Sequence, residues 1–428
     1  MSPLSVSTFL SPDMSFDVVI FDEASQIFPW GAIGAIYRAK QLIVVGDSQQ
    51  MPPSNQFMCT NDSDDDEEED IDDFESILDL CSSSFRPRNL SWHYRSRNES
   101  LIAFSNKNFY NNKLITFPSS RINDKGLGVD FFYVENSIFD GISKTNKNEA
   151  EKVVELVFYN FRNHPERSVG VVAFNKQQSD LIEKLIYTER QKYDEFEDFF
   201  KSDREEPFFV KNLENVQGDE RDIIIFSATY AKNSSSNKLF LNFGPINKSG
   251  GERRLNVAFT RAKYNIQLVS SIHYYDIDVS RTNSVGVRLL REYLDYAENG
   301  NIGLQRSIKT DNSSLFEEFD SEFEVQVSKF LRENGFCVDT QVGCSSFRID
   351  LALKTPDSSD YVLAIECDGA TYHSSKTARD RDRLRQEILE GMGWTFYRIW
   401  STDWFRNNKE EKNRLLTTAT NALNRNSI

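Results

Sequence analysis

Three continuous apolar runs most constrain how this chain of 428 residues can fold. They span residues 169–174, 223–227 and 266–270. Strands of this kind are buried on both faces, which is typical of parallel sheets covered by helices. Segments with helical periodicity, residues 148–161 and 177–187, lie before and between the runs. Because strands and helices alternate, the sequence predicts an α/β domain with a mostly parallel sheet.

Two further apolar strands, near the N-terminus, end in polar loops. Residues 16–21 run into Asp22 and Glu23, and residues 41–45 run into a loop that continues to Gln50. An acidic pair at the carboxyl end of an apolar strand is where α/β folds place ligand chemistry. Taken singly, each loop could be an ordinary end of a strand.

Together, and about twenty-five residues apart, these loops resemble motifs II and III of superfamily 1 helicases of the 5′→3′ class. The resemblance continues in the same order along the chain. Residues 90–97 (LSWHYRSR) are similar to motif IV, residues 214–220 (ENVQGDE) to motif V, and residues 253–263 (RRLNVAFTRAK) to motif VI. The resemblance implies a partial first RecA-like lobe over residues 1–87 and a complete second lobe over residues 88–310.

This resemblance also implies roles for individual residues. Asp22 would position Mg²⁺ on ATP, Glu23 would orient the attacking water, and Gln50 would sense the γ-phosphate. Arg95 and Arg261 would stabilise the charge on the transferred phosphoryl group, which suits a permanently charged, planar guanidinium. Three residues of motifs V and VI complete the implied nucleotide site: Gly218, Glu220 and Arg254. Without this motif context, a lone arginine is more often part of a surface salt bridge.

The sequence contains no P-loop, the GxxxxGK(S/T) string that holds the β- and γ-phosphates in such helicases. We therefore expect no autonomous ATP hydrolysis, and ATP only in a more complete assembly. Three explanations stay open: the C-terminal half of a longer or mis-started reading frame, a subunit whose partner supplies the P-loop, or a degenerate helicase retained for DNA binding. The motif arginines favour the first two, because a lobe released from ATP hydrolysis would not need them.

Near the C-terminus, two strand-like runs deliver carboxylates at their ends. In residues 349–354 the apolar side chains alternate with Asp350, which faces away from the Ile/Leu side. In residues 361–369, Glu366 and Asp368 are two apart and share one face of a strand. Turn-forming residues 356–359 predict a hairpin that brings Asp350 near Glu366. Clustered carboxylates suit Mg²⁺ or Mn²⁺, although acidic strand ends are commonly just solvated.

Residues 321–324, 341–343, 348–350, 365–369, 372–373 and 393–404 together resemble the very-short-patch-repair-like branch of the PD-(D/E)xK endonuclease superfamily. The resemblance covers residues 311–428 and implies an αβββαβ core in which Asp350 and Glu366 hold the metal and Glu324 supports it. The metal would activate water for phosphodiester hydrolysis. The signature usually ends in Lys, where this chain has Asp368; His373 or the metal itself is the candidate to orient the water.

Three segments allow less specific predictions. Residues 378–389 predict a charged helix, rich in arginines suited to phosphates, with Leu384, Ile388 and Leu389 as its buried stripe. The aromatic-rich residues 193–209 could stack on bases, although core packing is the commoner fate of phenylalanines. The polar residues 300–316 predict a linker.

The net charge of −16 is unusual for a protein that binds nucleic acid. Eleven acidic residues fall within an insertion, residues 61–75, and without them the net charge is −5. We expect a solvated segment there, with DNA mimicry as the alternative. The sequence has no apolar run of membrane-spanning length, no recognisable secretory signal and no CxxC pair. These features favour the cytoplasm, or wherever the cellular DNA is.

The sequence thus predicts an α/β protein with a partial and a complete RecA-like lobe followed by a restriction-endonuclease-like domain. The expected function is metal-dependent cleavage of nucleic acid, with DNA as the expected substrate, joined to an incomplete helicase module. Two alternatives remain open: a catalytically silent nucleic-acid-binding or assembly subunit, and an ATPase completed by a P-loop-bearing partner.

Overall fold

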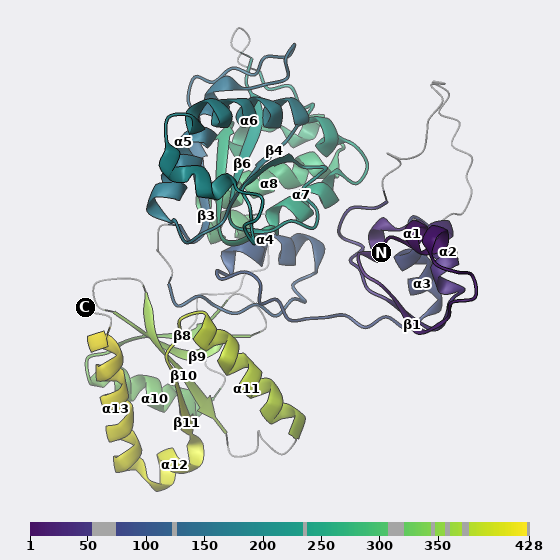
Figure 1. The fold of residues 1–428 in the computed structure, drawn as a ribbon. Coiled ribbons are helices and arrows are strands. Elements are labelled where there is room, and N and C mark those ends of the chain that lie inside the picture. The colour runs from purple at the N-terminus through teal and green to yellow at the C-terminus, as the bar shows by residue number, and fades with distance from the viewer. Residues whose placement is uncertain are drawn as a thin grey trace.

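The structure is a computed structural model that describes residues 1–53, 74–121, 126–233, 238–306, 321–343, 347–355, 360–369 and 376–425. In this part of the chain, α/β units follow one another around separate sheets (Figure 1). The predicted α/β class is confirmed. Most of the acidic insertion, residues 61–73, lies outside the described residues. None of the described helices has the length and apolar character that a bilayer crossing requires.

The N-terminal unit contains a sheet of two parallel strands, β1 (Phe16–Phe21) and β2 (Ala39–Val44). The strands are accompanied by α1 (Pro3–Phe9), α2 (Pro29–Ile36) and α3 (Ile77–Ser84). A small core joins the strands to α2 and α3 through Phe21, Ala32, Ala35 and Ile77.

The central unit contains the predicted parallel sheet, with strand order β3-β7-β6-β4-β5. Its strands are β3 (Gly128–Tyr133), β4 (Val169–Ala173), β5 (Phe209–Asn212), β6 (Arg221–Ala231) and β7 (Ala262–Ser271). The helices around it are α4 (Ser100–Phe109), α5 (Lys147–Asn163), α6 (Lys176–Arg190), α7 (Gly251–Phe259), α8 (Val285–Asn299) and α9 (Asn301–Arg306). The presence of α9 corrects the linker prediction for residues 301–306: Gly300, at φ 58°, ends α8 and lets the chain start another helix.

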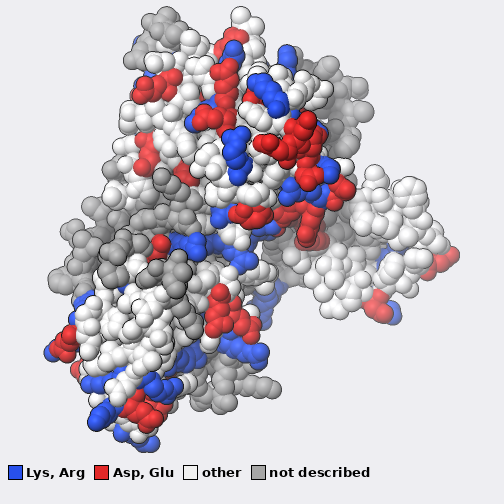
Figure 2. Space-filling view, turned by 60° about the vertical axis from the view of Figure 1, so that its left-hand side comes forward, with Lys and Arg blue, Asp and Glu red and all other residues white. Residues whose placement is uncertain are grey.

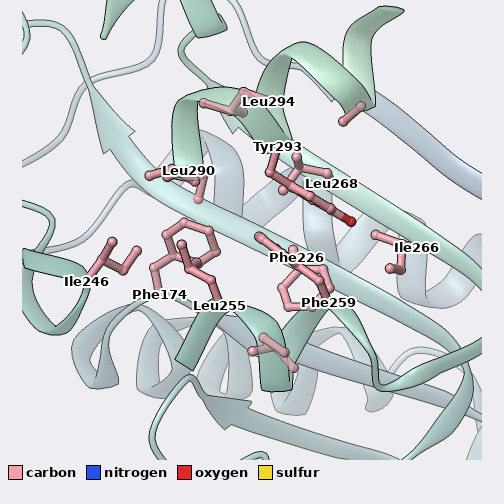
Figure 3. Packing of buried hydrophobic residues seen from close by; sticks show 14 of the residues in the cluster. Phe174, Phe226, Ile246, Leu255, Phe259, Ile266, Leu268, Leu290, Tyr293 and Leu294 are labelled. Atoms are coloured by element: carbon pink, nitrogen blue, oxygen red, sulfur yellow. The ribbon is translucent and has the colours of Figure 1, made fainter. Parts of the chain in front are cut away.

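Two hydrophobic clusters cover the two faces of this sheet. One packs α4, α7 and α8 against the strands through residues such as Phe226, Phe259 and Tyr293 (Figure 3). The other packs α5 and α6 against the opposite face. Phe199 belongs to the second cluster and stacks on Phe161, with ring centroids 4.1 Å apart. The core interpretation of the aromatic-rich segment is therefore confirmed for Phe199.

The C-terminal unit has a mixed sheet with strand order β11-β10-β9-β8. Its elements follow the order α10 (Glu322–Glu333), β8 (Cys337–Val342), β9 (Ile349–Lys354), β10 (Tyr361–Asp368), α11 (Lys376–Gly391), β11 (Phe396–Trp400), α12 (Ser401–Arg406) and α13 (Asn408–Arg425). This is the implied αβββαβ order with two helices added. β9 and β10 pair antiparallel, as the hairpin prediction requires, and β11 pairs parallel to β10.

A stretch of the central unit completes the core of the C-terminal unit. We call residues 115–120 the docking segment. Trp92 forms a parallel bridge with Ile115, and Phe117 is buried among C-terminal residues. Trp394 Nε1 donates a hydrogen bond to the Pro118 carbonyl (2.8 Å). The C-terminal unit is therefore anchored to a segment that follows α4 and is bridged to Trp92 of the motif IV-like stretch.

Candidate functional site

The N-terminal and central units meet at the residues expected to bind a nucleotide. Asp22 and Glu23 directly follow β1, and Glu23 adopts a left-handed backbone conformation (φ 51°). Its amide N–H donates to Asp22 Oδ1 (2.9 Å). Gln217 Nε2, from the motif V-like loop, donates to Glu23 Oε2 across the two units (3.3 Å). The fold thus brings the acidic pair against a loop almost two hundred residues away.

The two predicted arginines lie close enough for their charges to interact. Arg95 Nε lies 2.9 Å from Glu220 Oε2 in an ion pair. Arg261 is only 5% exposed, and its Nε donates to the Val257 carbonyl (2.8 Å). Burial lowers the pKa of Arg261, the charge of Arg95 lowers it further, and Glu23 and Glu220 raise it. Two arginines whose charges repel each other, beside two carboxylates, are consistent with a site arranged for an anion.

Gln50 belongs to a second contact between the units. Asp47 Oδ2 accepts hydrogen bonds from Gln50 Nε2 (3.0 Å) and from the Tyr110 hydroxyl (2.7 Å). Asn256 Nδ2 donates to the Gln49 carbonyl (2.9 Å) and contacts Tyr110 Oη (3.0 Å). No motif in the sequence points to Tyr110, whereas Asn256 could have been found as part of the motif VI-like segment.

Gly218 and Arg254 are the remaining two residues predicted to contribute to a nucleotide site. Gly218 has φ 86°, so any L-residue would be strained there, and it shapes the loop between Gln217 and Glu220. Arg254 Nη1 donates to the Ser249 carbonyl (3.3 Å), and its Nε lies 3.9 Å from Glu214. Its contacts with the motif V-like loop therefore run through Glu214.

A cluster of charged side chains in the C-terminal unit lies where β9 begins and β10 ends. The Cys367 amide of β10 donates to Asp350 Oδ2 of β9 (2.7 Å), which ties the two strand ends together. The register Ala364↔Ala352 and Ile365↔Leu351 leads directly to the neighbouring positions of Glu366 and Asp350. The prediction that the hairpin brings these two carboxylates together agrees with this register.

The environment of Glu366 disfavours the ionised form of its carboxyl group. Its Oε1 is buried and has no hydrogen-bond partner among the described residues. Burial raises the pKa of Glu366 well above its usual range, and the charges of Asp350 and Asp368 raise it further. Arg398 and Arg385 act in the opposite direction. A carboxylate in this position is stabilised by a cation.

Asp368 has an arginine beside it. Arg398 Nε lies 3.0 Å from Asp368 Oδ2, but the pair lacks the angles of a hydrogen bond, so the contact is an ion pair. Glu324, on α10, accepts hydrogen bonds from Ser321 Oγ (2.8 Å) and Gln341 Nε2 (3.0 Å). Its support of a metal stays a prediction. His373 lies outside the described residues.

No three His, Cys, Asp or Glu side chains are arranged to hold a metal ion in the part of the chain that the structure describes. Mg²⁺ needs fewer, since proteins usually bind it through one or two carboxylates, with water and substrate phosphate completing the octahedron. The partnerless Glu366 oxygen beside Asp350 fits such a site. The donor set therefore suits a hard divalent cation.

The helix α11 corrects one prediction. Leu384 is 48% exposed, whereas Leu389 is fully buried. The face that packs on the sheet is centred on Ile388 and Leu389, and Arg385 lies over the Phe347 ring at 5.2 Å from its centroid. Arg385 therefore takes the place on the packed face that was expected for Leu384.

Both signs of charge are interspersed on the face of the molecule shown in Figure 2, with basic side chains at the junction of the central and C-terminal units.

Comparisons with known proteins agree with this arrangement. Residues 72–273 match the family model AAA_12, described as an AAA domain, and residues 323–418 match the model REase_MTES_1575. The chain carries a helicase-like AAA domain followed by a restriction-endonuclease-like domain. The first match contains the motif IV-like to VI-like stretches, and the second contains Glu324, Asp350, Glu366 and Asp368.

Similar curated proteins are uncharacterized ATP-dependent helicases. The MG140 homolog of Mycoplasma pneumoniae is 33% identical over 94% of this chain and 37% of its own length. MG140 of Mycoplasma genitalium is 37% identical over 66% of this chain and 25% of its own length. The chain thus spans about a third or less of these relatives. The DNA replication ATP-dependent helicase/nuclease DNA2 of Gallus gallus is 28% identical over 60% of this chain and 23% of its own length. Among solved structures, the PRRSV helicase matches with a TM-score of 0.27 and 13% identity over 59% of this chain and 34% of that chain.

Proposed function

We propose that this protein hydrolyses phosphodiester bonds of nucleic acid, with DNA as the expected substrate, at Asp350 and Glu366. The observation that carries the proposal is the pairing of these carboxylates on adjacent strands, with Glu366 Oε1 buried and without a hydrogen-bond partner in the described residues. Such a pair repels itself unless a cation lies between its members.

The residues of the chain would perform separate tasks in this reaction. Asp350 and Glu366 would hold Mg²⁺ or Mn²⁺, which when bound activates water and stabilises charge on the phosphate. The Cys367 amide keeps the Asp350 carboxylate oriented through its 2.7 Å hydrogen bond. Glu324, fixed by Ser321 and Gln341, would support the site from α10. Asp368 stands where the signature has Lys, so we assign His373 as the candidate to orient the water.

The test is cleavage of supercoiled and linear DNA by the purified chain with Mg²⁺ or Mn²⁺. Asp350→Ala and Glu366→Ala are each expected to lower the rate at least about 100-fold, because either change removes a metal ligand. Glu333→Gln is the matched control, since this carboxylate is exposed on α10. Cleavage that persists in both alanine variants would refute the assignment, and DNA binding without cleavage by the unaltered chain would favour the silent binding subunit.

A second function, ATP hydrolysis in a completed cleft, is supported by the surface of the N-terminal unit. Parallel strands are normally buried on both faces, yet Val18 and Ile20 of β1 are 41% and 62% exposed, and Val45 after β2 is 43% exposed. We infer that a P-loop-bearing segment covers this sheet, with Asp22 positioning Mg²⁺ on ATP.

This inference predicts no ATP hydrolysis by the chain alone and measurable hydrolysis when a P-loop-bearing polypeptide is added. Arg261→Ala should abolish the added activity, because this buried arginine lies within electrostatic reach of Glu23, Glu220 and Arg95, the residues expected to meet the nucleotide phosphates. Hydrolysis that is unchanged by Arg261→Ala would contradict the role of this residue.

A further inference from the structure

The position that the nuclease signature gives to Lys is occupied here by Asp368, so the positive charge of the site must come from elsewhere in the fold. β11 supplies one candidate. It pairs parallel to β10 with Glu366 opposite Arg398 and Asp368 opposite Trp400. Residues paired in register point to the same face of a sheet. Arg398 therefore lies on the face that carries Glu366 and Asp368.

The opposite face of the sheet is already occupied. Ile399 and Tyr397, the neighbours of Arg398 on β11, pack with the cluster that includes Leu415 of α13. The Tyr397 hydroxyl donates to Glu411 on α13 (2.7 Å). Because side chains alternate along a strand, these contacts place Arg398 away from α13 and on the carboxylate side.

The surroundings of Arg398 indicate that its positive charge can act on a ligand and is not only part of a structural ion pair. Its Nε lies 3.0 Å from Asp368 Oδ2 in an ion pair, and this buried nitrogen donates no hydrogen bond in the part of the chain that the structure describes. The side chains of Arg398 and Asp368 are 28% and 13% exposed, so solvent screens their attraction only partly. A guanidinium that retains donors can bind a phosphate oxygen while one carboxylate orients it.

We propose that Arg398 is the basic catalytic residue of the nuclease site, contacting a non-bridging oxygen of the scissile phosphate, and that Asp368 positions it. The inference rests on the proposed nuclease function. In the reaction, the attacking water gives one proton to solvent as its oxygen forms a bond to phosphorus, the bond from phosphorus to the leaving oxygen breaks, and the leaving oxygen receives a proton from solvent. Arg398 neither takes nor gives a proton, because a guanidinium stays protonated.

The first experiment measures DNA binding without metal. Fluorescence anisotropy with a labelled duplex oligonucleotide in EDTA, at several salt concentrations, is compared for the unaltered chain, Arg398→Gln and Arg398→Lys. Arg398→Gln is expected to weaken binding several-fold and to reduce the slope of log affinity against log salt by about one, since one phosphate contact is lost. Arg398→Lys should keep the slope. Arg414→Gln is the control, because this arginine lies on α13, on the other face, and is 65% exposed.

The second experiment measures cleavage with Mn²⁺ as kcat and KM. Arg398→Gln is expected to lower kcat roughly 100-fold, the usual effect of removing one donor to a charge that develops in the transition state, with a smaller change in KM. Asp368→Lys combined with Arg398→Gln moves the positive charge to the signature position, and is expected to recover at least about tenfold in kcat over Arg398→Gln alone. A structural ion pair would predict no recovery.

The outcomes separate the two proposals. Suppose that the unaltered chain cleaves DNA, that Glu366→Ala is inactive, and that Arg398→Gln cleaves within about twofold of the unaltered chain. The nuclease assignment then stands, and the proposed role of Arg398 is overturned. If the unaltered chain does not cleave, the nuclease fails, and an unchanged salt slope in Arg398→Gln overturns the phosphate contact as well. Circular dichroism establishes whether each variant is folded. If Arg398→Gln is unfolded, the test uses Arg398→Lys, which must keep the slope of log affinity against log salt. A loss of this slope in Arg398→Lys refutes the inference.

Discussion

The attachment of the C-terminal unit to the docking segment can be tested at one hydrogen bond. Trp394 is 4% exposed and its indole N–H donates to the Pro118 carbonyl, while its ring stacks on Tyr361 with centroids 5.4 Å apart. Trp394→Phe keeps a ring in the core but removes the donor. The Pro118 carbonyl then stays buried without its partner, which costs about 1–3 kcal/mol. Trp394→Ala also removes the ring, and should cost about 3–5 kcal/mol.

Native-state hydrogen exchange is the appropriate assay, because unfolding of several units need not be two-state. The reporter is the Tyr361 amide, which donates to the Ser120 carbonyl at 2.7 Å. A loss of 1–3 kcal/mol predicts exchange about 5- to 150-fold faster at this amide in Trp394→Phe. Trp30→Phe, at a residue that is 51% exposed on α2, should leave it unchanged. Equal exchange rates in the unaltered chain and Trp394→Phe would refute the docking-segment interpretation.

Two other predictions concern the central unit. Burial raises the pKa of Glu149 from 4.5 to about 7, so the folded state holds this proton more tightly than the unfolded state. The contribution of Glu149 to the free energy of unfolding is fully present below pH 4.5, and about 3 kcal/mol of it is lost as the pH rises through 7. Glu149→Gln should flatten the dependence of the unfolding free energy on pH in this range. Equal pH dependences of the unfolding free energy in the unaltered chain and the variant, measured by urea denaturation, would contradict the prediction. Gly251→Ala should destabilise the central unit by about 1–3 kcal/mol, because the new Cβ would lie 2.1 Å from the Ile246 carbonyl oxygen. Thermal unfolding measures this effect. Gly31→Ala is the control, because a Cβ at this position meets nothing within 4 Å.

The elements that the sequence predicted best are those whose signal is local. The runs at residues 169–174, 223–227 and 266–270 became β4 and parts of β6 and β7, because uninterrupted apolar strands are compatible only with burial on both faces. The β9–β10 hairpin followed from alternation and turn residues. The approach of Glu23 to Gln217 could be expected only from the order of the motifs, since periodicity does not report contacts between distant segments.

The contacts that the sequence could not predict join residues far apart in the chain. Trp394 and Pro118 are separated by 276 residues, and although Trp394 belongs to the endonuclease-like stretch 393–404, Pro118 lies in no motif. Tyr110 reaches Asp47 for a similar reason: its hydroxyl needs a partner when buried, but the sequence does not identify which carboxylate supplies it. The pairing of Glu366 with Arg398 depended on β11 adding parallel to β10, an arrangement that the apolar pattern of residues 394–400 does not fix.

The error at α11 has a physical cause in the chemistry of the covered surface. An apolar stripe identifies the buried face of a helix when the surface beneath it is aliphatic. Here the helix crosses the rings of Trp92 and Phe347, and a guanidinium is attracted to the face of an aromatic ring. Arg385 therefore takes the position on the packed face that was assigned to Leu384, its aliphatic stem can cover apolar surface, and Leu384 turns toward solvent. The same rotation keeps the charge of Arg385 close enough to Glu366 to act on its pKa, so packing and site electrostatics select the same face.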